Sequence, residues 1–480
     1  MIILPEDLSF VRETAERKYD QIVKMNRAVW EYAELNFREE KSAAILSGLL
    51  EKEGFAVQRD LAGLKTAFTA RFGEGKPVIG ILAEYDALPH LGQTAGSARK
   101  DPDQETKNGH GCGHSALGAG SIGAALIVKN FLEKHDLPGS VILYGCPAEE
   151  GGNGKVYMVR AGLFRDLDAA ILWHPADRNL ASPFRAVANF KTRFTFHGIS
   201  AHAGKNPEEG RSALDACELM NIGVNYLREH ITSTTRIHYA YENPGGNFPS
   251  VVPDYASINY YVRAANSEEA RAVLDRVIDI ARGAALMSGT QMEYEPMGGL
   301  SDFYPNLTVS NVLSAAFCAV GGPDFDEKED AIAREFLQTF PDPVKEKAIL
   351  EGSQLEGIDP DLFVQRPLIR TVVPGSDSDR NIILTSSFDA GDVSYVVPTS
   401  QIYAAVGCIG TSLHSWQLTG QTGSSIGDKA AQAAARALAL AAILFYRDPS
   451  LLKKAKEEFD AEIGNSYRSP LPDELVPPRF

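Results

Sequence analysis

The strongest constraint on the fold is an alternation of short apolar segments with helical patterns. Nearly continuous apolar runs lie at residues 77–83, 140–146 and 168–173, and a helical pattern rich in small and apolar residues fills 115–135. Strands that are apolar along their whole length are buried on both faces, and helices supply that cover. The pattern therefore predicts an α/β domain with a mostly parallel sheet covered on both faces.

A different order of elements occupies residues 189–299. Strand and helix patterns follow one another there as β-α-β-β-α-β, which is the split βαβ arrangement of an α+β, ferredoxin-like domain. A chain of 480 residues is long enough for two domains. We expect an α/β domain formed by residues 1–188 and 300–480, with the ferredoxin-like domain inserted between them, and helices with loops in 300–380.

Composition excludes several classes of partner. The formal net charge of −16 argues against a nucleic-acid or anionic-membrane partner, because both call for a basic face. Residues 1–21 do not resemble a signal peptide or a membrane span, and the apolar run at 434–446 suits a buried helix. The five cysteines are odd in number and form no CxxC pair, which favours a reducing, cytoplasmic compartment.

Two potential metal ligands stand two residues apart in the stretch NGHGCGHSALGAG, at Cys112 and His114. In extended backbone, side chains at i and i+2 leave on the same side, so both can reach one ion. The glycines around them permit the dihedral angles that such a turn requires. A redox thiol, or a buried cysteine beside a hydrogen-bonded histidine, are the alternatives that this pair leaves open.

Further polar residues follow other predicted strands. They are Asp86, the pair Glu149 and Glu150, His174, and His414. In open α/β sheets, sites form outside the carboxyl ends of the strands, so these side chains are expected to meet. Adjacent carboxylates repel each other unless a cation or a shared proton relieves them.

The assembled set is typical of a hydrolytic metal centre. One thiolate, one carboxylate and three imidazoles suit zinc, with manganese as the second choice. Five ligands exceed what one catalytic ion needs, so two divalent ions are expected. Such ions lower the pKa of water, and a neighbouring carboxylate carries its proton to the leaving amine.

Two other motifs point to different chemistry and are rejected. GAGSIG at 118–123 matches GxGxxG, but no strand precedes it and it lies within the predicted helix, where small residues favour close packing. GSSIG at 423–427 matches GxSxG, but the nucleophile elbow needs an apolar strand just upstream, whereas LTGQT is not one. Helix capping by serine is the better interpretation of this stretch.

Six ordered motifs resemble a known family. The chain is similar to the aminoacylase/carboxypeptidase-type metallo-amidohydrolases of the metallopeptidase superfamily, over nearly its whole length. The motifs are GHGCGHSALGAG, PAEEGGNGKVYM, WHP, ISAHAGKNPEEGRSALDA, GDVSYVVPT and LHSWQ.

The resemblance assigns roles to individual residues. It implies that Glu149 is the general base and that Asp86 orients a metal-binding histidine. The ligands that it implies are Cys112, His114, Glu150, His174 and His414.

The resemblance also implies that the inserted domain is a lid and dimerisation module of a homodimeric enzyme. His202 matches a lid histidine that reaches the active site of the other protomer and polarises the scissile carbonyl. Two positions depart from the family pattern. Ser115 stands where Asp or Asn is usual, and Ser250 stands where an Asn that contributes to substrate binding is usual, which leaves substrate preference open.

The expected reaction is metal-dependent hydrolysis of the amide bond of an N-acyl amino acid. An aryl-acyl amino acid such as p-aminobenzoyl-glutamate is the first expected substrate. Two alternatives remain: a dipeptidase or another acyl-amino-acid hydrolase, and a partner subunit that needs a paralogue for activity.

Overall fold

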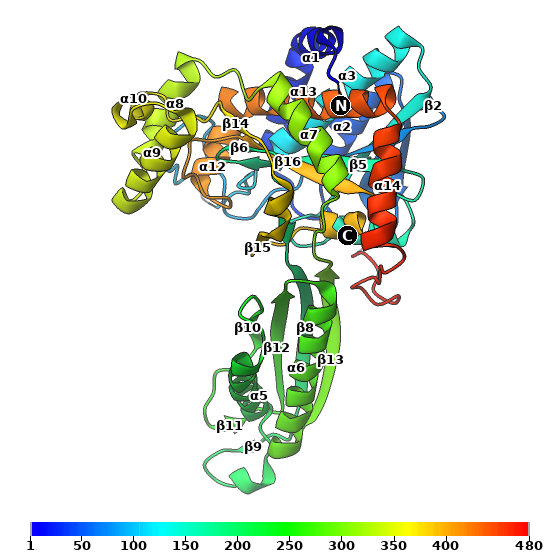
Figure 1. The fold of residues 1–480 in the computed structure, drawn as a ribbon. Helices are drawn as coiled ribbons and strands as arrows, with labels where there is room; N and C mark the ends of the chain where they lie inside the picture. The colour runs from blue at the N-terminus through cyan, green and yellow to red at the C-terminus, as the bar shows by residue number, and fades with distance from the viewer. Residues whose placement is uncertain (1, 105, 479–480) are drawn as a thin grey trace.

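The computed structural model describes residues 2–104 and 106–478, which form a large domain and a smaller one that extends from it (Figure 1). The large domain contains an eight-stranded sheet in the order β1-β2-β4-β3-β5-β16-β6-β14. The small domain contains a four-stranded sheet in the order β10-β12-β8-β13. The predicted two-domain α/β architecture is confirmed.

The centre of the large sheet is parallel, as predicted. Its four parallel strands are β4 (Gly139–Gly145), β3 (Val78–Ala83), β5 (Ala169–Ala176) and β16 (Thr399–Ala405). The antiparallel hairpin β1 (Ala56–Leu61) and β2 (Leu64–Glu74) extends one edge, and its outer strand is largely exposed, so no apolar run marks it. The other edge holds β6 (Asn179–Leu180) and β14 (Val372–Val373).

Helices cover both faces of the large sheet. The first core contains residues of seven helices: α1 (Pro5–Tyr32), α2 (Glu40–Lys52), α3 (His114–His135), α7 (Leu307–Val320), α12 (Trp416–Thr422), α13 (Ser425–Arg447) and α14 (Ser450–Glu462). The second core contains residues of α4 (Gly154–Arg160) and α11 (Ala390–Ser394). Although α3 and α13 are long and apolar enough to cross a membrane, 89% and 94% of their apolar windows are buried, as in core helices.

The structure agrees with the rejection of the two other motifs. The GxGxxG match lies inside α3, and a Cβ added at Gly120 would meet Ala431 O at 2.9 Å and the Trp173 ring at 3.0 Å, so small residues let α3 approach α13 and β5. Ser424 of the GxSxG match is the N-cap of α13 and accepts from Ile426 N. Neither motif forms a nucleotide loop or a nucleophile elbow.

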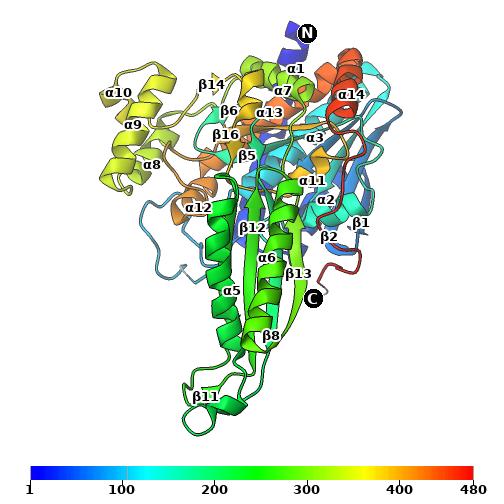
Figure 2. The same ribbon diagram turned by 60° about the horizontal axis from the view of Figure 1, so that its bottom comes forward.

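The small domain has the predicted β-α-β-β-α-β order. Its elements are β8 (Ala188–His197), α5 (Ala213–Leu227), β10 (Arg236–Asn243), β12 (Tyr255–Ala264), α6 (Ser267–Ser288) and β13 (Gln291–Leu300). All of its strand pairs are antiparallel, and α5 and α6 cover one face of the sheet (Figure 2). The exact domain limits, residues 189 and 299, remain a prediction. Strand β8 begins one residue before the first limit, and β13 ends one residue after the second.

The end of the small domain away from the large sheet is a short two-stranded ladder. It pairs β9 (Ala201–His202) with β11 (Val251–Val252). We call residues 198–210 and 244–253 the tip.

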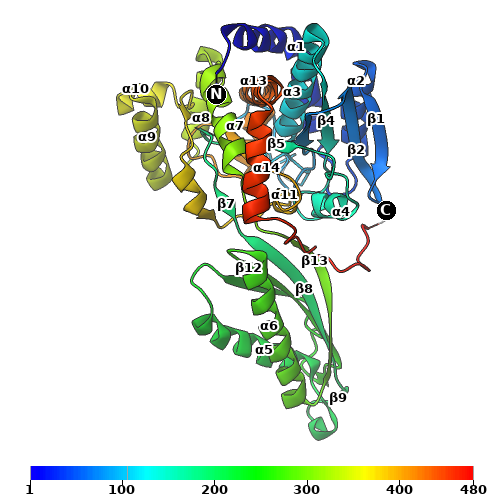
Figure 3. The same ribbon diagram turned by 45° about the vertical axis from the view of Figure 1, so that its right-hand side comes forward.

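The remaining elements are a helical lobe beside the large sheet and several short elements in both domains. Helices α8 (Glu327–Leu337), α9 (Asp342–Glu356) and α10 (Pro360–Gln365) form a lobe on the side opposite the β1–β2 hairpin (Figure 3). The shorter elements are α12 (Trp416–Thr422), β7 (Arg185–Ala186), β15 (Ile383–Leu384), η1 (Pro207–Glu209), η2 (Arg228–His230) and η3 (Asp377–Asn381).

Candidate metal centre

A cavity of about 720 Å³ lies at the carboxyl ends of the central strands, where the two domains meet. Residues of both domains line it, among them Glu149 and Lys191. We call this cavity the cleft. Ligand sites in open α/β sheets lie outside the carboxyl ends of strands, so its position agrees with that rule.

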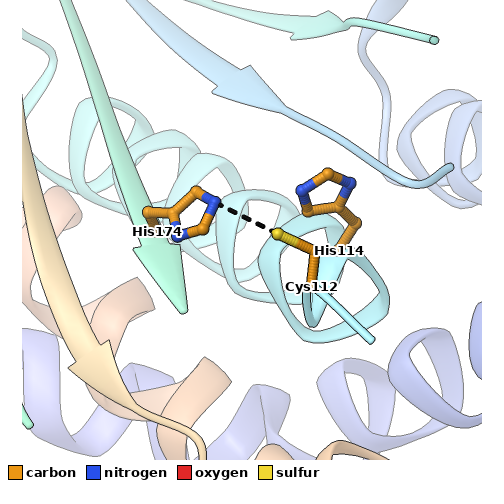
Figure 4. A group of neighbouring side chains, drawn as sticks. All are labelled: Cys112, His114 and His174. Atoms are coloured by element: carbon orange, nitrogen blue, oxygen red, sulfur yellow. Dashed lines mark hydrogen bonds between the residues drawn. The ribbon is translucent and has the colours of Figure 1, made fainter. Parts of the chain in front are cut away.

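Cys112, His114 and His174 meet at the start of α3 (Figure 4). Cys112 Sγ lies 3.6 Å from His174 Nε2, and His174 extends from the end portion of β5. Gly113 separates the cysteine from His114 and has a φ of 81°, which a residue with a Cβ rarely adopts. A Cβ there would also meet Pro175 at 2.8 Å, so glycine is required for this turn.

A second group joins Cys112 to Glu150 and His414. His414 Nε2 lies 3.3 Å from Glu150 Oε2, and one potential ligand atom from each of the three residues lies within 4.8 Å of the others. Glu150 follows β4, and His414 lies in the loop between β16 and α12. The structure thus brings together all five residues that the sequence selected as ligands, with Cys112 in both groups.

Asp86 lies beside His114. Its Oδ1 is 2.9 Å from His114 Nδ1, and its Oδ2 accepts a hydrogen bond from Glu150 N at 2.9 Å. A carboxylate on one ring nitrogen fixes the tautomer and leaves the other nitrogen directed at an ion. This is the geometry expected of an orienting residue.

Several buried atoms here lack hydrogen-bond partners. Within the described residues, His114 Nε2, Glu150 Oε1 and Glu84 Oε2 accept or donate no hydrogen bond. Buried polar atoms are normally paired, so unpaired lone pairs that converge in one place suit a cation. Sulfur, imidazole and carboxylate donors together suit zinc or manganese. The residues therefore fit two divalent ions, with the Cys112 sulfur available to both.

Electrostatics favour the same interpretation. Burial raises the pKa of Glu149 well above its usual range, and the nearby carboxylates of Glu84, Asp389 and Glu150 raise it further. Burial likewise raises the pKa of Glu150 to about 7. Divalent cations would relieve this accumulation of negative charge.

Two backbone positions at the ligand candidates are strained. Ala148, just before Glu149, has a φ of 59°, and His414 has a φ of 57°. Left-handed conformations of residues other than glycine cost on the order of 1–3 kcal/mol and concentrate at functional sites. The surrounding structure thus holds both loops in a defined conformation.

The sequence analysis does not identify a buried charge network behind the ligand candidates. Lys155 Nζ lies 2.6 Å from Glu84 Oε1 and 2.5 Å from Asp389 Oδ1, and all three side chains are buried. Glu84 Oε2 in turn lies 3.4 Å from His114 Nε2. Glu84 stands two residues before Asp86 after the same strand, a signal that could have identified it. A lone lysine in a helical pattern gives no such signal.

The structure does not bring His202 and Ser250 to the cleft of their own chain. Both lie at the tip, where His202 is exposed and its Nδ1 accepts from Gly204 N at 3.1 Å. The Ser250 carbonyl accepts from Ala203 N at 2.9 Å. Neither residue lines the cleft of its own chain.

Comparison with known proteins agrees with this architecture. The profile of peptidase family M20/M25/M40 matches residues 80–331. The chain is 37% identical to one of the subunits of p-aminobenzoyl-glutamate hydrolase of Escherichia coli, over 99% of each chain. It is 28% identical to the Xaa-Arg dipeptidase of Mus musculus, over 95% of this chain and 94% of that one.

A solved structure has the same fold. The Bacillus subtilis protein described as a dinuclear metal-binding peptidase of the M20 family superposes with a TM-score of 0.55 at 19% identity. The match covers 88% of this chain and 98% of that one. From the profile match and the full-length relative together, the chain belongs to peptidase family M20/M25/M40.

Proposed function

We propose that the chain is a metal-dependent amidohydrolase that cleaves the amide bond of N-acyl amino acids, with p-aminobenzoyl-glutamate-like compounds as first substrates. The observation that carries the proposal is the convergence of the five ligand candidates, with unpaired buried atoms, beside Glu149 in one cleft. The name of the E. coli relative supports this choice of substrate.

The proposed metal ligands are Cys112, His114, Glu150, His174 and His414. They would hold two ions, zinc or manganese, and the dinuclear description of the B. subtilis structure supports that number. Bound ions of this kind supply Lewis acidity, which polarises an amide carbonyl and acidifies water. Asp86 holds His114 in the orientation that this requires.

Glu149 is the proposed proton carrier. It lines the cleft, and its Oε2 lies 4.0 Å from His114 Nε2. The carboxylate takes a proton from the water that attacks the amide carbon. The carboxylic acid then donates this proton to the amide nitrogen as the C–N bond breaks, which releases a carboxylic acid and an amino acid. A carboxyl group in this position can both accept and donate this proton.

We further propose a cytoplasmic homodimer in which His202 and Ser250 act at the partner's cleft. The tip carries exposed apolar side chains, with Phe248 74%, Ile199 55% and Val251 49% exposed. Isolated exposed apolar residues are ordinary, but three at one end of a domain favour an interaction surface.

A dipeptidase is the second candidate, because the M. musculus relative is named as one. The third is a subunit that is active only with a paralogue. Purified protein supplied with Zn²⁺ or Mn²⁺ and a panel of acyl amino acids and dipeptides separates the three. Turnover of acyl amino acids that Glu149→Gln abolishes, with metal content retained, supports the proposal, and no turnover of any amide contradicts it.

A further inference from the structure

The small domain supplies one wall of the cleft from the face of its sheet that α5 and α6 leave open (Figure 2). On neighbouring strands β8 and β12, Lys191 is the register partner of Tyr261, and Asn189 is the register partner of Arg263. All four side chains line the cleft. Two cations therefore enter the cleft from adjacent positions of one sheet.

Neither cation has an anionic partner among the described residues. Lys191 Nζ donates only to Gly151 O, at 3.3 Å, and Arg263 Nη1 donates only to Thr385 O, at 3.4 Å. Arg263 Nε is buried and donates no hydrogen bond. Burial, the main cause, lowers the pKa of both side chains, and for Lys191 it outweighs the opposing effect of the Glu149 and Asp389 carboxylates, neither of which forms an ion pair with it.

Arg193 lies on the same open face but outside the cleft, and unlike Lys191 and Arg263 it is paired with carboxylates. Its guanidinium pairs with Glu295 at 2.6 Å and with Glu242 at 2.7 Å. In a chain with a net charge of −16, carboxylates are abundant, yet none pairs with Lys191 or Arg263 in the part of the chain that the structure describes. The two cations in the cleft are thus left available for a ligand.

The chemistry that matches two free cations is a pair of carboxylates. Ammonium and guanidinium groups bind carboxylates through short, charge-assisted hydrogen bonds. Asn189 lies opposite Arg263 and two residues before Lys191, is buried, and has an unpaired Oδ1. Its amide can present either donors or an acceptor to a ligand.

We propose that Lys191 and Arg263 bind the two carboxylates of an acidic amino-acid moiety, so that the enzyme selects N-acyl derivatives of glutamate or aspartate. This inference rests on the proposed function, whose cleft it shares. It also predicts that substrates that release arginine or lysine are poor, because two cations repel a basic side chain. The specificity would then differ from the one that the name of the M. musculus relative describes.

The test compares p-aminobenzoyl-glutamate with p-aminobenzoyl-glutamine, which has nearly the same shape and one carboxylate fewer. We expect the protein to favour the glutamate compound at least about tenfold in kcat/KM. Lys191→Met and Arg263→Met each remove one cation, and at least one of them should lower that preference about tenfold. Arg263→Lys keeps the charge and should keep most of the preference. Arg193→Met, on the same face but outside the cleft, is the matched control and should leave it unchanged.

Binding gives a second readout that does not depend on turnover. Dissociation constants of the two compounds are measured by fluorescence titration on the Glu149→Gln variant, with and without Lys191→Met or Arg263→Met. Equal binding of the two compounds, or a preference that both cation variants retain, overturns the proposal. A binding preference for glutamate in a protein that hydrolyses neither compound supports the recognition site and contradicts the proposed hydrolysis instead.

Discussion

In the cleft, the ligand candidates are brought together by one chain, and two of their buried atoms, His114 Nε2 and Glu150 Oε1, have no hydrogen-bond partner among the described residues. At the tip, His202 and Ser250 are exposed and do not line the cleft of their own chain. Both regions carry residues that the sequence singles out, but they differ in what they need. In the proposed function, the cleft is complete within one chain and takes metal ions, whereas His202 and Ser250 act only at the cleft of a second chain.

The substitution with the largest expected effect on activity is in the cleft. Glu149→Gln should lower kcat about 10²–10⁴-fold, because the proton carrier is lost. Metal content should stay at the wild-type level, because Glu149 is not a proposed ligand. Glu150→Gln is the matched change at the neighbouring position and should lower both activity and metal content. Steady-state kinetics and elemental analysis of the same samples make the comparison, and metal loss in Glu149→Gln would contradict the assigned roles.

The next largest effect is on protein stability and comes from the buried charge network behind the ligand candidates. Lys155→Met leaves Glu84 and Asp389 buried without their cation and should lower the free energy of unfolding by about 3–5 kcal/mol. Denaturant unfolding measures the change. Glu209→Gln, at the exposed tip, should change it by less than about 0.5 kcal/mol. Similar losses in the two variants would show that the cleft and the tip do not differ as described.

A mixing experiment tests whether the tip acts on a second chain. His202→Ala should retain metal and stability but lose activity about 10²-fold, since an electrophilic hydrogen-bond donor is lost. Mixed with Glu149→Gln and allowed to exchange protomers, it should regain up to about a quarter of wild-type activity, since half the dimers then contain one complete site. Activity that stays at the sum of the two inactive parents would place His202 outside the partner's cleft.

The last effect is a pH dependence of stability where the two domains join. Burial raises the pKa of Asp392 to about 7, although Tyr467 and Ser301 donate hydrogen bonds to it. The native state therefore binds a proton between about pH 4 and 7 that the unfolded chain does not bind. The contribution of Asp392 to stability is thus fully present below about pH 4 and is lost as the pH rises to about 7.

Asp392→Asn cannot titrate, so its unfolding free energy should depend less on pH. The difference between wild type and variant, measured by urea unfolding at several pH values, should shift against the wild type from about pH 4 to about pH 7. A constant difference across that range would contradict the assignment.

The sequence predicts the parts of the structure that follow regular patterns. Apolar strands and the residues after them place Asp86, Glu149, Glu150 and His174 at one end of a parallel sheet. The sequence does not predict the β1–β2 hairpin. Its outer strand is exposed and polar, so neither an apolar run nor a regular alternation of apolar and polar residues marks that strand.

The sequence does not predict the cations of the site, for a different reason. Lys155, Lys191 and Arg263 occur singly in helix and strand patterns, where a charged side chain normally faces solvent. Only the tertiary structure shows that Lys155 is buried between two carboxylates and that the other two line the cleft. Their roles depend on contacts between residues far apart in the chain, which no local pattern contains.

Anomalous diffraction from crystals grown with Zn²⁺ tests the central claim most directly. If the five ligand candidates form a dinuclear centre, the maps will show two peaks per chain, both adjacent to Cys112 Sγ, one beside His114 or His174 and one beside Glu150 or His414. A single peak, or peaks away from these side chains, would contradict the account.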